Sequence, residues 1–292
     1  MFMYFHRMQH LSISRWMFSF IVLICIGCKQ TAQEQSDKLY SRHLQRQVDL
    51  KIFHTKITGD RDQLNLLLLN DGADIEKLHG FETIDSLFKA GKIGPTLVVA
   101  IDAADRMQEY GVSGKPDFAK RGSKADNYDA FINNELIPYI RKKSETRKFQ
   151  KVAIAGASLG GLSAFDIGWN HADKFDVVGV FSGSFWWRDK DITDSSYSND
   201  NNRIVLSKLK ASRKTPSNRF WFYAGKKEEI GDRDNDGIID MIDDSKDVIN
   251  IMIEKRKMNP SQIAYLESAN GEHGWPSWAA VFPDFVLWAF QK

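Results

Sequence analysis

The chain has 292 residues, of which 42% are hydrophobic and 12% aromatic, so it can bury a sizeable core. Its 40 Lys and Arg residues nearly balance its 38 Asp and Glu residues, and the formal net charge of +2 gives no electrostatic case for a nucleic-acid partner. Both cysteines, Cys25 and Cys28, lie in an N-terminal apolar run, so the sequence beyond them offers neither an internal disulfide nor a cysteine metal site.

The N-terminal segment has the pattern of an export signal. Arg7 and Arg15 precede an apolar run at residues 17–27, and a polar stretch follows it. A basic region followed by a short apolar core is typical of a signal peptide, whereas a transmembrane helix needs about 20 apolar residues. We therefore predict an exported protein whose signal occupies residues 1–28.

The end of this run resembles the bacterial lipobox, in which a signal peptidase cuts before a cysteine that then carries lipid. Gly27 precedes Cys28 here, although Cys25 stands where the lipobox has leucine. The resemblance implies a bacterial cell-envelope lipoprotein held at the membrane only through Cys28. The alternatives are a periplasmic or secreted protein without lipid, and an uncleaved anchor. Residues 29–44 are predicted as a flexible tether before one domain over residues 45–292.

Apolar runs bounded by turn residues predict strands over residues 48–57, 64–69, 96–101, 151–155, 177–182, 219–224 and 262–268. Helical periodicity predicts helices over residues 81–90, 128–142, 159–170, 203–211, 245–258 and 277–290. Strands and helices alternate through the middle of the chain, which favours an α/β class with a mostly parallel sheet and helices on both faces. In such sheets the functional sites lie beyond the carboxyl ends of the strands.

A glycine-rich turn with a serine at its centre follows the strand predicted at 151–155. Gly156, Ser158 and Gly160 form a G-x-S-x-G pattern between a buried strand and a helix, which is the context of a hydrolase nucleophile. The turn needs glycines because side chains two residues either side of the serine would clash. We therefore predict Ser158 as a nucleophile, with the N-terminus of the following helix favouring negative charge nearby.

Together with other segments, this turn resembles the putative-esterase family of α/β-hydrolases, which contains esterase D and the enterochelin (enterobactin) esterases. The similar segments, in chain order, are LLLLNDG (66–72), VVAID (98–102), GASLGGLSAF (156–165), VFSGSFWW (180–187), FYAGKKEE (222–229) and GEHGWPSW (271–278). The serine-glycine-serine segment before two tryptophans and the H-x-W-x-x-W ending are the more specific ones. The resemblance covers residues 45–290 and implies the α/β-hydrolase fold.

The fold also implies a histidine late in the chain, in a loop just before the last helix, and His273 occupies that place. It would take the proton of Ser158 and return it to the leaving alkoxide. The family pattern places the triad acid about three residues after Gly225, which selects Glu228, with Glu229 or a later aspartate as alternatives. The order serine, acid, histidine is the one expected for this fold.

Two backbone N–H donors are expected to hold the oxyanion. One is predicted at Leu159, directly after the nucleophile. The resemblance places the other near Gly72 and Ala73, after the strand at 64–69, without deciding which of the two donates. The alternative is an ordinary strand-to-helix turn with no role in catalysis.

Residues 232–243 have the ligand spacing of an EF-hand-type calcium loop. Its predicted ligands are the side chains of Asp232, Asp234, Asp236, Asp240 and Asp243 and the backbone carbonyl of Ile238. We expect a structural Ca²⁺ that fixes the acid-bearing segment and does no chemistry, and no organic cofactor. An acidic solvated loop without metal is the alternative.

Aromatic residues gather after the predicted strands and near His273. Trp186, Trp187 and Trp275 would suit a planar or cyclic substrate if they line the rim of the site, although such residues pack in a core equally often. Arg106 lies in a long polar connection and is a further candidate for substrate binding.

The sequence therefore predicts a serine carboxylic-ester hydrolase that works through an acyl-enzyme. The predicted partner is a small-molecule or glycan ester, with carbohydrate-linked acyl esters first and siderophore esters as the alternative. Export favours the first, since a polymer cannot enter the cell. A non-catalytic, calcium-stabilised module that binds glycan is the opposing class, and peptidase activity is a third possibility for the same triad.

Overall fold

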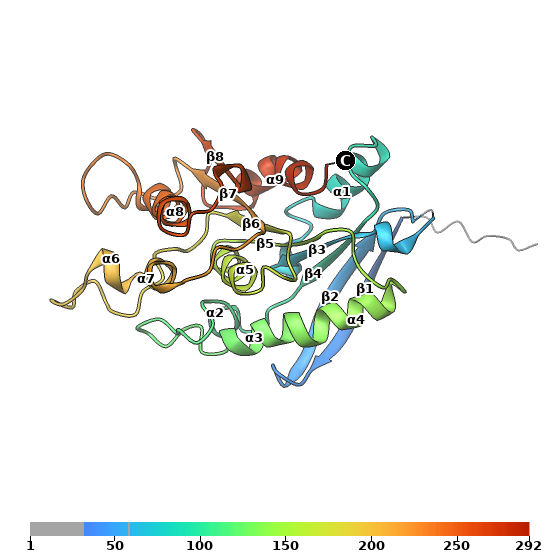
Figure 1. The fold of residues 1–292 in the computed structure, drawn as a ribbon, viewed down its shortest axis with the longest axis horizontal. Helices are drawn as coiled ribbons and strands as arrows, with labels where there is room; N and C mark the ends of the chain where they lie inside the picture. The colour runs from blue at the N-terminus through green and yellow to red at the C-terminus, as the bar shows by residue number, and fades with distance from the viewer. Residues whose placement is uncertain (1–31, 58, 292) are drawn as a thin grey trace, which may run out of the picture.

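The computed structural model describes residues 32–57 and 59–291, so the predicted signal and lipobox at residues 1–28 lie outside the described residues. Its strands span β1 Gln33–Ser41, β2 Arg46–His54, β3 Asn65–Asn70, β4 Thr96–Ile101, β5 Val152–Ala157, β6 Val177–Phe181, β7 Arg219–Gly225 and β8 Ile263–Ser268. They form one sheet in the order β1-β2-β4-β3-β5-β6-β7-β8 (Figure 1). Pairing is antiparallel from β1 to β2 and from β2 to β4, and parallel from β4 to β8. The predicted mostly parallel sheet is confirmed.

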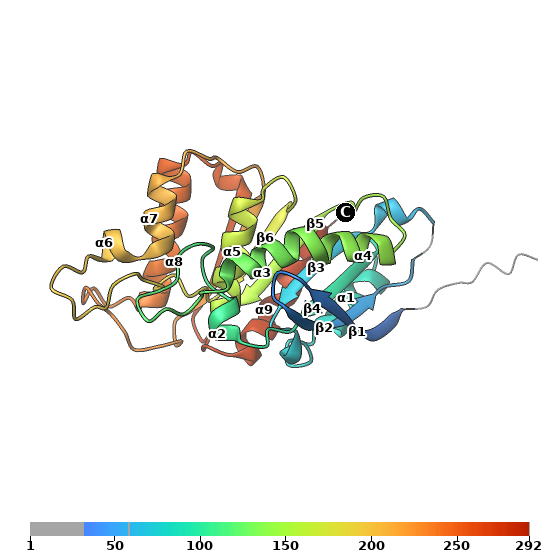
Figure 2. The ribbon, with the colours of Figure 1, turned by 90° about the horizontal axis from the view of Figure 1, so that it is seen from below.

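The helices lie on both faces of this sheet, as predicted. They span α1 Gly80–Lys89, α2 Arg106–Glu109, α3 Ala125–Phe131, α4 Ile137–Lys143, α5 Leu159–Asn170, α6 Asn199–Asn202, α7 Ile204–Ala211, α8 Asp240–Asn250 and α9 Trp275–Phe290. A π turn, η3 Ile132–Leu136, joins α3 to α4, and a second, η4 Ile251–Lys255, extends α8. Helices α1 and α9 cover one face, and α3, α4, α5, α7 and α8 cover the other (Figures 1 and 2). None of the helices in the described part of the chain has the length and apolar character needed to cross a membrane.

The central strands are near-continuous apolar runs because each has a core on both sides. In β3, Leu66 and Leu68 enter the core beneath α3, α4 and α5, while Leu67 and Leu69 enter the core beneath α1 and α9. Successive side chains of a strand point to opposite faces, so burial of both faces favours apolar residues at most positions of the strand. This two-sided burial makes a rigid platform, and the carboxyl ends of β5 to β8 set the positions of the loops that follow.

Strand β1 corrects one prediction. Residues 29–44 were expected to form a flexible tether, but Gln33–Ser41 pair with β2 along their whole length. The Asp37 carboxylate also accepts hydrogen bonds from Tyr139 and Lys143 of α4. The strand lies at the edge of the sheet and is largely exposed, so its sequence is polar and lacks the apolar run that marks the other strands.

Candidate active site

The turn after β5 holds Ser158 in a strained backbone conformation. Ser158 has φ 54° and ψ −121°, a region that non-glycine residues rarely adopt. The flanking glycines are required by space: a Cβ at Gly156 would lie 2.4 Å from the Gly160 carbonyl oxygen, and one at Gly160 would lie 2.5 Å from an Asp71 carboxylate oxygen. The close approach of these backbones leaves the Ser158 side chain at the start of α5, beyond the carboxyl edge of the sheet.

The structure brings together the three side chains predicted as a triad. His273 Nε2 lies 3.0 Å from Ser158 Oγ, and His273 Nδ1 lies 2.9 Å from Glu228 Oε2. The residues follow β5, β7 and β8, and the Glu228 side chain is fully buried while that of His273 is 33% exposed. A buried carboxylate at Nδ1 favours the tautomer with its proton on that nitrogen, which leaves Nε2 free to accept the serine proton.

The geometry also distinguishes Glu228 from its neighbour. Glu228 Oε1 accepts hydrogen bonds of 2.6 Å from both Ser182 Oγ and the Gly225 backbone N–H. Glu229 instead accepts a 2.6 Å hydrogen bond from the Met241 backbone N–H at the start of α8. Burial raises the pKa of Glu229, and the Met241 N–H opposes that shift. The side chain directed at His273 is therefore that of Glu228.

Two further residues, Ser182 and Trp278, fix the position of the Glu228 carboxylate and were not predicted from the sequence to do so. Ser182 is fully buried with φ 50°, and its Oγ accepts a 2.9 Å hydrogen bond from Trp278 Nε1. Both lie in segments that the family resemblance had marked, but they are far apart in sequence, so no local pattern predicts their contact.

The predicted oxyanion donors also lie at this edge of the sheet. The N–H groups of Leu159, Gly72 and Ala73 make no hydrogen bond within the part of the chain that the structure describes. Gly72 begins a 3-10 turn packed so tightly on β4 that a Cβ would lie 2.5 Å from backbone atoms of that strand. The preceding Asp71 N–H is not available, because it donates to Tyr110 Oη at 2.8 Å.

Arg106, predicted to contact substrate, is bound within the protein. Its Nε donates to Asp71 Oδ1 at 2.6 Å, and its Nη2 donates to the Ala157 carbonyl at 3.2 Å. Burial raises the pKa of Asp71, and the Arg106 guanidinium opposes that shift. Arg106 thus ties the turn before Gly72 to the residue before Ser158.

The three predicted substrate tryptophans have different environments. Trp187 is fully buried in the core, so its predicted substrate contact is wrong and the alternative core reading holds. Trp186 and Trp275 are half-buried. The Trp275 ring packs edge-on against Trp278, with centroids 5.1 Å apart, and lines a shallow surface hollow with Lys77 and His79.

Part of the predicted calcium loop converges on one point. Carboxylate oxygens of Asp232, Asp234 and Asp236 all lie within 4.8 Å of one another, a group that could bind a metal ion. Burial raises the pKa of Asp243 to about 6, and the charges of Asp236 and Asp234 add to the rise. One oxygen of Asp243 is shielded from solvent and has no hydrogen-bond partner among the described residues.

Two other predicted ligands, Asp240 and Ile238, lie outside the converging group of carboxylates. Asp240 begins α8, and its Oδ1 accepts from the backbone N–H and from Nε of Arg233, at 2.9 and 2.8 Å. The Arg233 guanidinium thus neutralises Asp240 in this arrangement, and the predicted role of Asp240 as a metal ligand stays a prediction. The Ile238 side chain packs with Met241 and Ile242, and the role of its backbone carbonyl as a metal ligand stays a prediction.

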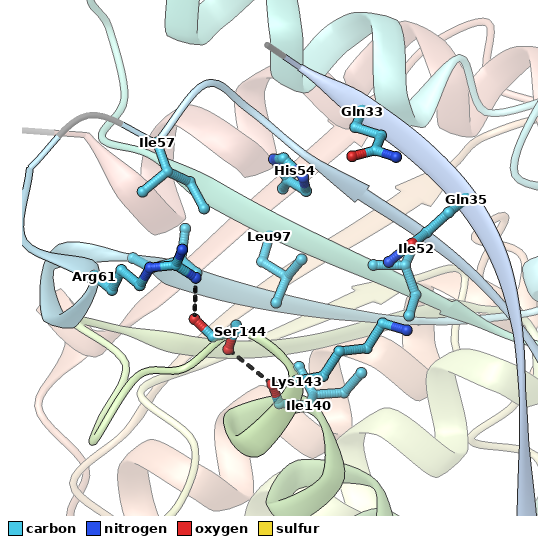
Figure 3. A pocket seen from close by; sticks show the side chains of 11 residues that line it. Gln33, Gln35, Ile52, His54, Ile57, Arg61, Leu97, Ile140, Lys143 and Ser144 are labelled. Carbon is cyan, nitrogen blue, oxygen red and sulfur yellow. Dashed lines mark hydrogen bonds between the residues drawn. The ribbon is translucent and has the colours of Figure 1, made fainter. Parts of the chain in front are cut away.

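A cavity of about 220 Å³ lies elsewhere, between β1, β2 and the end of α4 (Figure 3). Leu97, at the start of β4, and Leu64, just before β3, line it, so it lies at the amino ends of these parallel strands. Its two cationic side chains are already used, because Arg61 donates to the Ser144 carbonyl and Lys143 to Asp37. None of the predicted site residues lines it.

A family model described as "Putative esterase" matches residues 41–289. The chain belongs to this esterase family. The family resemblance inferred from the sequence is thereby confirmed. This family member is 27% identical over 158 residues to the iron(III) enterobactin esterase of Escherichia coli K12, a match that covers 53% of the chain and 36% of the relative. The chain spans about half or less of the length of the curated relatives that it matches.

Solved structures confirm the α/β-hydrolase-type fold. The enterobactin esterase of Shigella flexneri superposes with a TM-score of 0.66 at 21% identity, over 89% of this esterase-family chain and 60% of the solved chain. A structure described as a ferulic acid esterase gives a TM-score of 0.65 at 18% identity, over 89% of this chain and 98% of that one. At these identities the likeness concerns the fold.

Proposed function

We propose that the chain is a serine carboxylic-ester hydrolase that works through an acyl-enzyme. The observation that carries the proposal is the unbroken hydrogen-bonded path from Ser158 Oγ through the imidazole of His273 to Glu228. A nucleophile, a base and an orienting acid in contact form the constellation that activates a serine hydroxyl.

In the proposed reaction, Ser158 Oγ attacks the ester carbonyl carbon while His273 Nε2 takes its proton. The buried Glu228 carboxylate stabilises the imidazolium that forms. The oxyanion would accept hydrogen bonds from the Leu159 N–H and from the turn at Gly72 and Ala73. His273 then protonates the leaving alkoxide, and a water molecule releases the acyl group by the same steps in reverse.

For substrate, we propose carbohydrate-linked acyl esters, with siderophore esters as the second candidate. Support for the first comes from the predicted export signal and from a fold neighbour described as a ferulic acid esterase. Support for the second comes from the enterobactin esterases among the relatives. Hydrolysis of p-nitrophenyl acetate, feruloyl esters and a catechol siderophore ester, compared side by side, tests the assignment.

A fluorophosphonate probe tests the catalytic proposal itself. The probe should label the wild-type protein and leave Ser158→Ala unlabelled, because it reacts with an activated serine oxygen. A non-catalytic, glycan-binding module would give no labelling in either protein, together with no ester hydrolysis, and that result would refute the proposal.

We also propose that Asp232, Asp234, Asp236 and Asp243 hold a structural Ca²⁺. Carboxylate oxygens are the hard ligands that calcium prefers. Three of these aspartates lie between Glu229 and α8, and the fourth, Asp243, lies in the first turn of α8, so the set is close in sequence to the proposed triad acid. The ion would neutralise the repulsion among these carboxylates and fix the segment that carries Glu228.

Localisation is a further proposal, because its signal lies outside the described residues. We propose export to the bacterial cell envelope, with lipid on Cys28 as the only membrane attachment. Metabolic labelling with an alkyne fatty acid should mark the wild-type chain and not Cys28→Ser. Labelling of both, or of neither, would contradict the lipid anchor.

A further inference from the structure

Two arginines and their aromatic neighbours form a cluster just beyond β6, made of Phe118, Arg121, Trp186 and Arg188. The guanidinium carbon of Arg188 lies 5.1 Å from the Phe118 ring centroid and 5.8 Å from that of Trp186. The guanidinium carbon of Arg121 lies 5.4 Å from the Trp186 centroid. The Phe118 N–H donates to the Arg188 carbonyl at 3.0 Å, which ties the loop that carries Arg121 to the segment after β6.

The two arginines differ in their charge balance. Arg121 is paired with Asp117, whose side chain is fully buried. Arg188 forms no ion pair and its side chain donates no hydrogen bond within the described residues, and its Nε is shielded from solvent without a partner. A hydrogen bond from the Thr193 backbone N–H is the first cause that lowers the pKa of Asp191, and the charge of Arg188 contributes less to that lowering. The cluster thus carries one positive charge more than it neutralises.

A second shielded donor lies beside Arg121. The indole Nε1 of the fully buried Trp187 also lacks a hydrogen-bond partner among the described residues, and its ring centroid is 5.0 Å from the Arg121 guanidinium carbon. Leaving a buried donor unpaired costs about 1–3 kcal/mol. No acceptor among the described residues pairs with these donors, and the half-buried Arg188 is the one that an anionic ligand could reach.

The cluster lies close in the chain to a residue that contacts the candidate nucleophile. Trp186 lies two residues after Ser184, whose Oγ is 3.4 Å from Ser158 Oγ. The Ser184 N–H also donates to the Ser158 carbonyl at 3.2 Å. The chain thus leads within two residues from the vicinity of Ser158 Oγ to Trp186, whose ring contacts both guanidinium groups.

We propose that Arg188, with Arg121 beside it, binds an anionic group on the ester substrate, on a ring that packs against Trp186. This inference rests on the proposed esterase function. A guanidinium recognises paired anionic oxygens through parallel hydrogen bonds, and an indole face accommodates a planar or cyclic ring. Carboxylate and catecholate oxygens share this chemistry, so the substrate class is an acidic ring ester.

The test compares matched anionic and neutral esters. On the acyl side the pairs are p-nitrophenyl para-carboxybenzoate with its para-carbamoyl analogue, and p-nitrophenyl 2,3-dihydroxybenzoate with the plain benzoate, the second pair assayed at a pH at which the catechol is ionised. On the alcohol side the pair is para-carboxyphenyl acetate with para-carbamoylphenyl acetate. The readout is the ratio of kcat/KM for the anionic ester to that for the neutral one. Intrinsic reactivity cancels when the ratio of a variant is divided by that of the wild type.

We expect this ratio to fall roughly tenfold in Arg188→Gln for at least one pair, the size of a charge-assisted hydrogen bond near the surface. Arg188→Lys should restore part of it, since it keeps the charge and loses the fork. Arg213→Gln is the matched control, because Arg213 is an exposed arginine on the loop after α7, and its ratio should equal that of the wild type. The ester pair whose ratio falls in Arg188→Gln shows whether the bound anion is a carboxylate or a catecholate, and whether it lies on the acyl or the alcohol side of the ester.

An independent arm uses only the wild-type protein. Its preference for the anionic ester should weaken as ionic strength rises, because salt screens a partly exposed charge. The inference is overturned if the ratios are unchanged in Arg188→Gln. If that variant does not fold, the inference is overturned when the wild-type preference for the anionic ester does not depend on salt. If the wild type hydrolyses none of these esters and resists the fluorophosphonate, the proposed function itself fails, which is a distinguishable result.

Discussion

Trp278 Nε1 donates a 2.9 Å hydrogen bond to Ser182 Oγ, and this contact determines the direction in which the Ser182 hydroxyl donates its own proton. An indole N–H is only a donor, so the hydroxyl must accept there and its own proton is directed to Glu228 Oε1 at 2.6 Å. Both residues are buried, so water cannot compete for these groups. The relay fixes the carboxylate that in turn orients His273.

The first prediction concerns this relay. Ser182→Ala should lower kcat/KM on p-nitrophenyl acetate roughly tenfold to a hundredfold, because a hydrogen bond to a buried carboxylate is worth about 1.5–3 kcal/mol. Trp278→Phe should act in the same direction with a smaller effect, since the hydroxyl can still reach Glu228. Ser245→Ala is the control: Ser245 is equally buried but bonds the Met241 carbonyl of its own helix, and its loss should leave kcat/KM alone. Equal losses in Ser182→Ala and Ser245→Ala would point to general destabilisation instead.

The second prediction sets stability against function at Ser158. Its φ of 54° costs a non-glycine residue about 1–3 kcal/mol, and glycine adopts this conformation freely. Ser158→Gly should therefore unfold at a higher temperature than Ser158→Ala, while both lose ester hydrolysis and fluorophosphonate labelling. Thermal melts followed by circular dichroism measure the difference. A Ser158→Gly melting temperature at or below that of Ser158→Ala would contradict the inferred backbone strain.

The third prediction separates the two adjacent glutamates. Glu228→Gln should lower kcat by on the order of a thousandfold or more, because an amide does not hold His273 in the tautomer that leaves Nε2 free. Glu229→Gln should cause a much smaller loss, since its carboxylate contacts the Met241 N–H and not the imidazole. Steady-state kinetics on one activated ester would decide between them. A greater loss in Glu229→Gln would exclude the assignment of Glu228.

The parallel core could be predicted from local apolar runs, and the meeting of Ser158, Glu228 and His273 could be predicted from the family resemblance and from the place of each residue after a strand. Apolar runs mark buried strands, and Ser158 and His273 each stand at a fixed place relative to a predicted element. Strand β1 was missed because an exposed edge strand needs no apolar run, and only its pairing with β2 reveals it. The start of α8 was also missed. The acidic motif at 232–243 predicted a loop up to Asp243, but Asp240 forms an ion pair with Arg233 and the helix begins at Asp240.

Contacts across the chain account for the other differences. The sequence does not distinguish the adjacent Trp186 and Trp187. Only the packing shows that Trp187 is buried and Trp186 is half-buried. The partner of Arg106 is Asp71, from a different strand end, so a residue that seemed available for substrate is used to hold the turn. Such assignments depend on tertiary distances that no local pattern encodes.

The last prediction concerns metal removal. A ligand that binds only the folded state raises its stability by about 2.7 kcal/mol at a hundredfold excess over Kd, so EDTA should lower the melting temperature of calcium-loaded protein, and added Ca²⁺ should restore it. Asp234→Asn should abolish this response, because Asp234 contributes to the converging carboxylates. Asp284→Asn, which changes an exposed aspartate on α9, should respond like the wild type.

The same experiment tests whether the ion is structural. We expect kcat/KM measured well below the melting temperature to change little on chelation, since the triad distances do not involve the loop carboxylates. A large loss of activity without a change in melting temperature would mean that the metal acts in the chemistry. An unchanged melting temperature in protein shown by mass spectrometry to carry calcium before chelation would remove the proposed site, because an ion held by four carboxylates must stabilise the fold that assembles them.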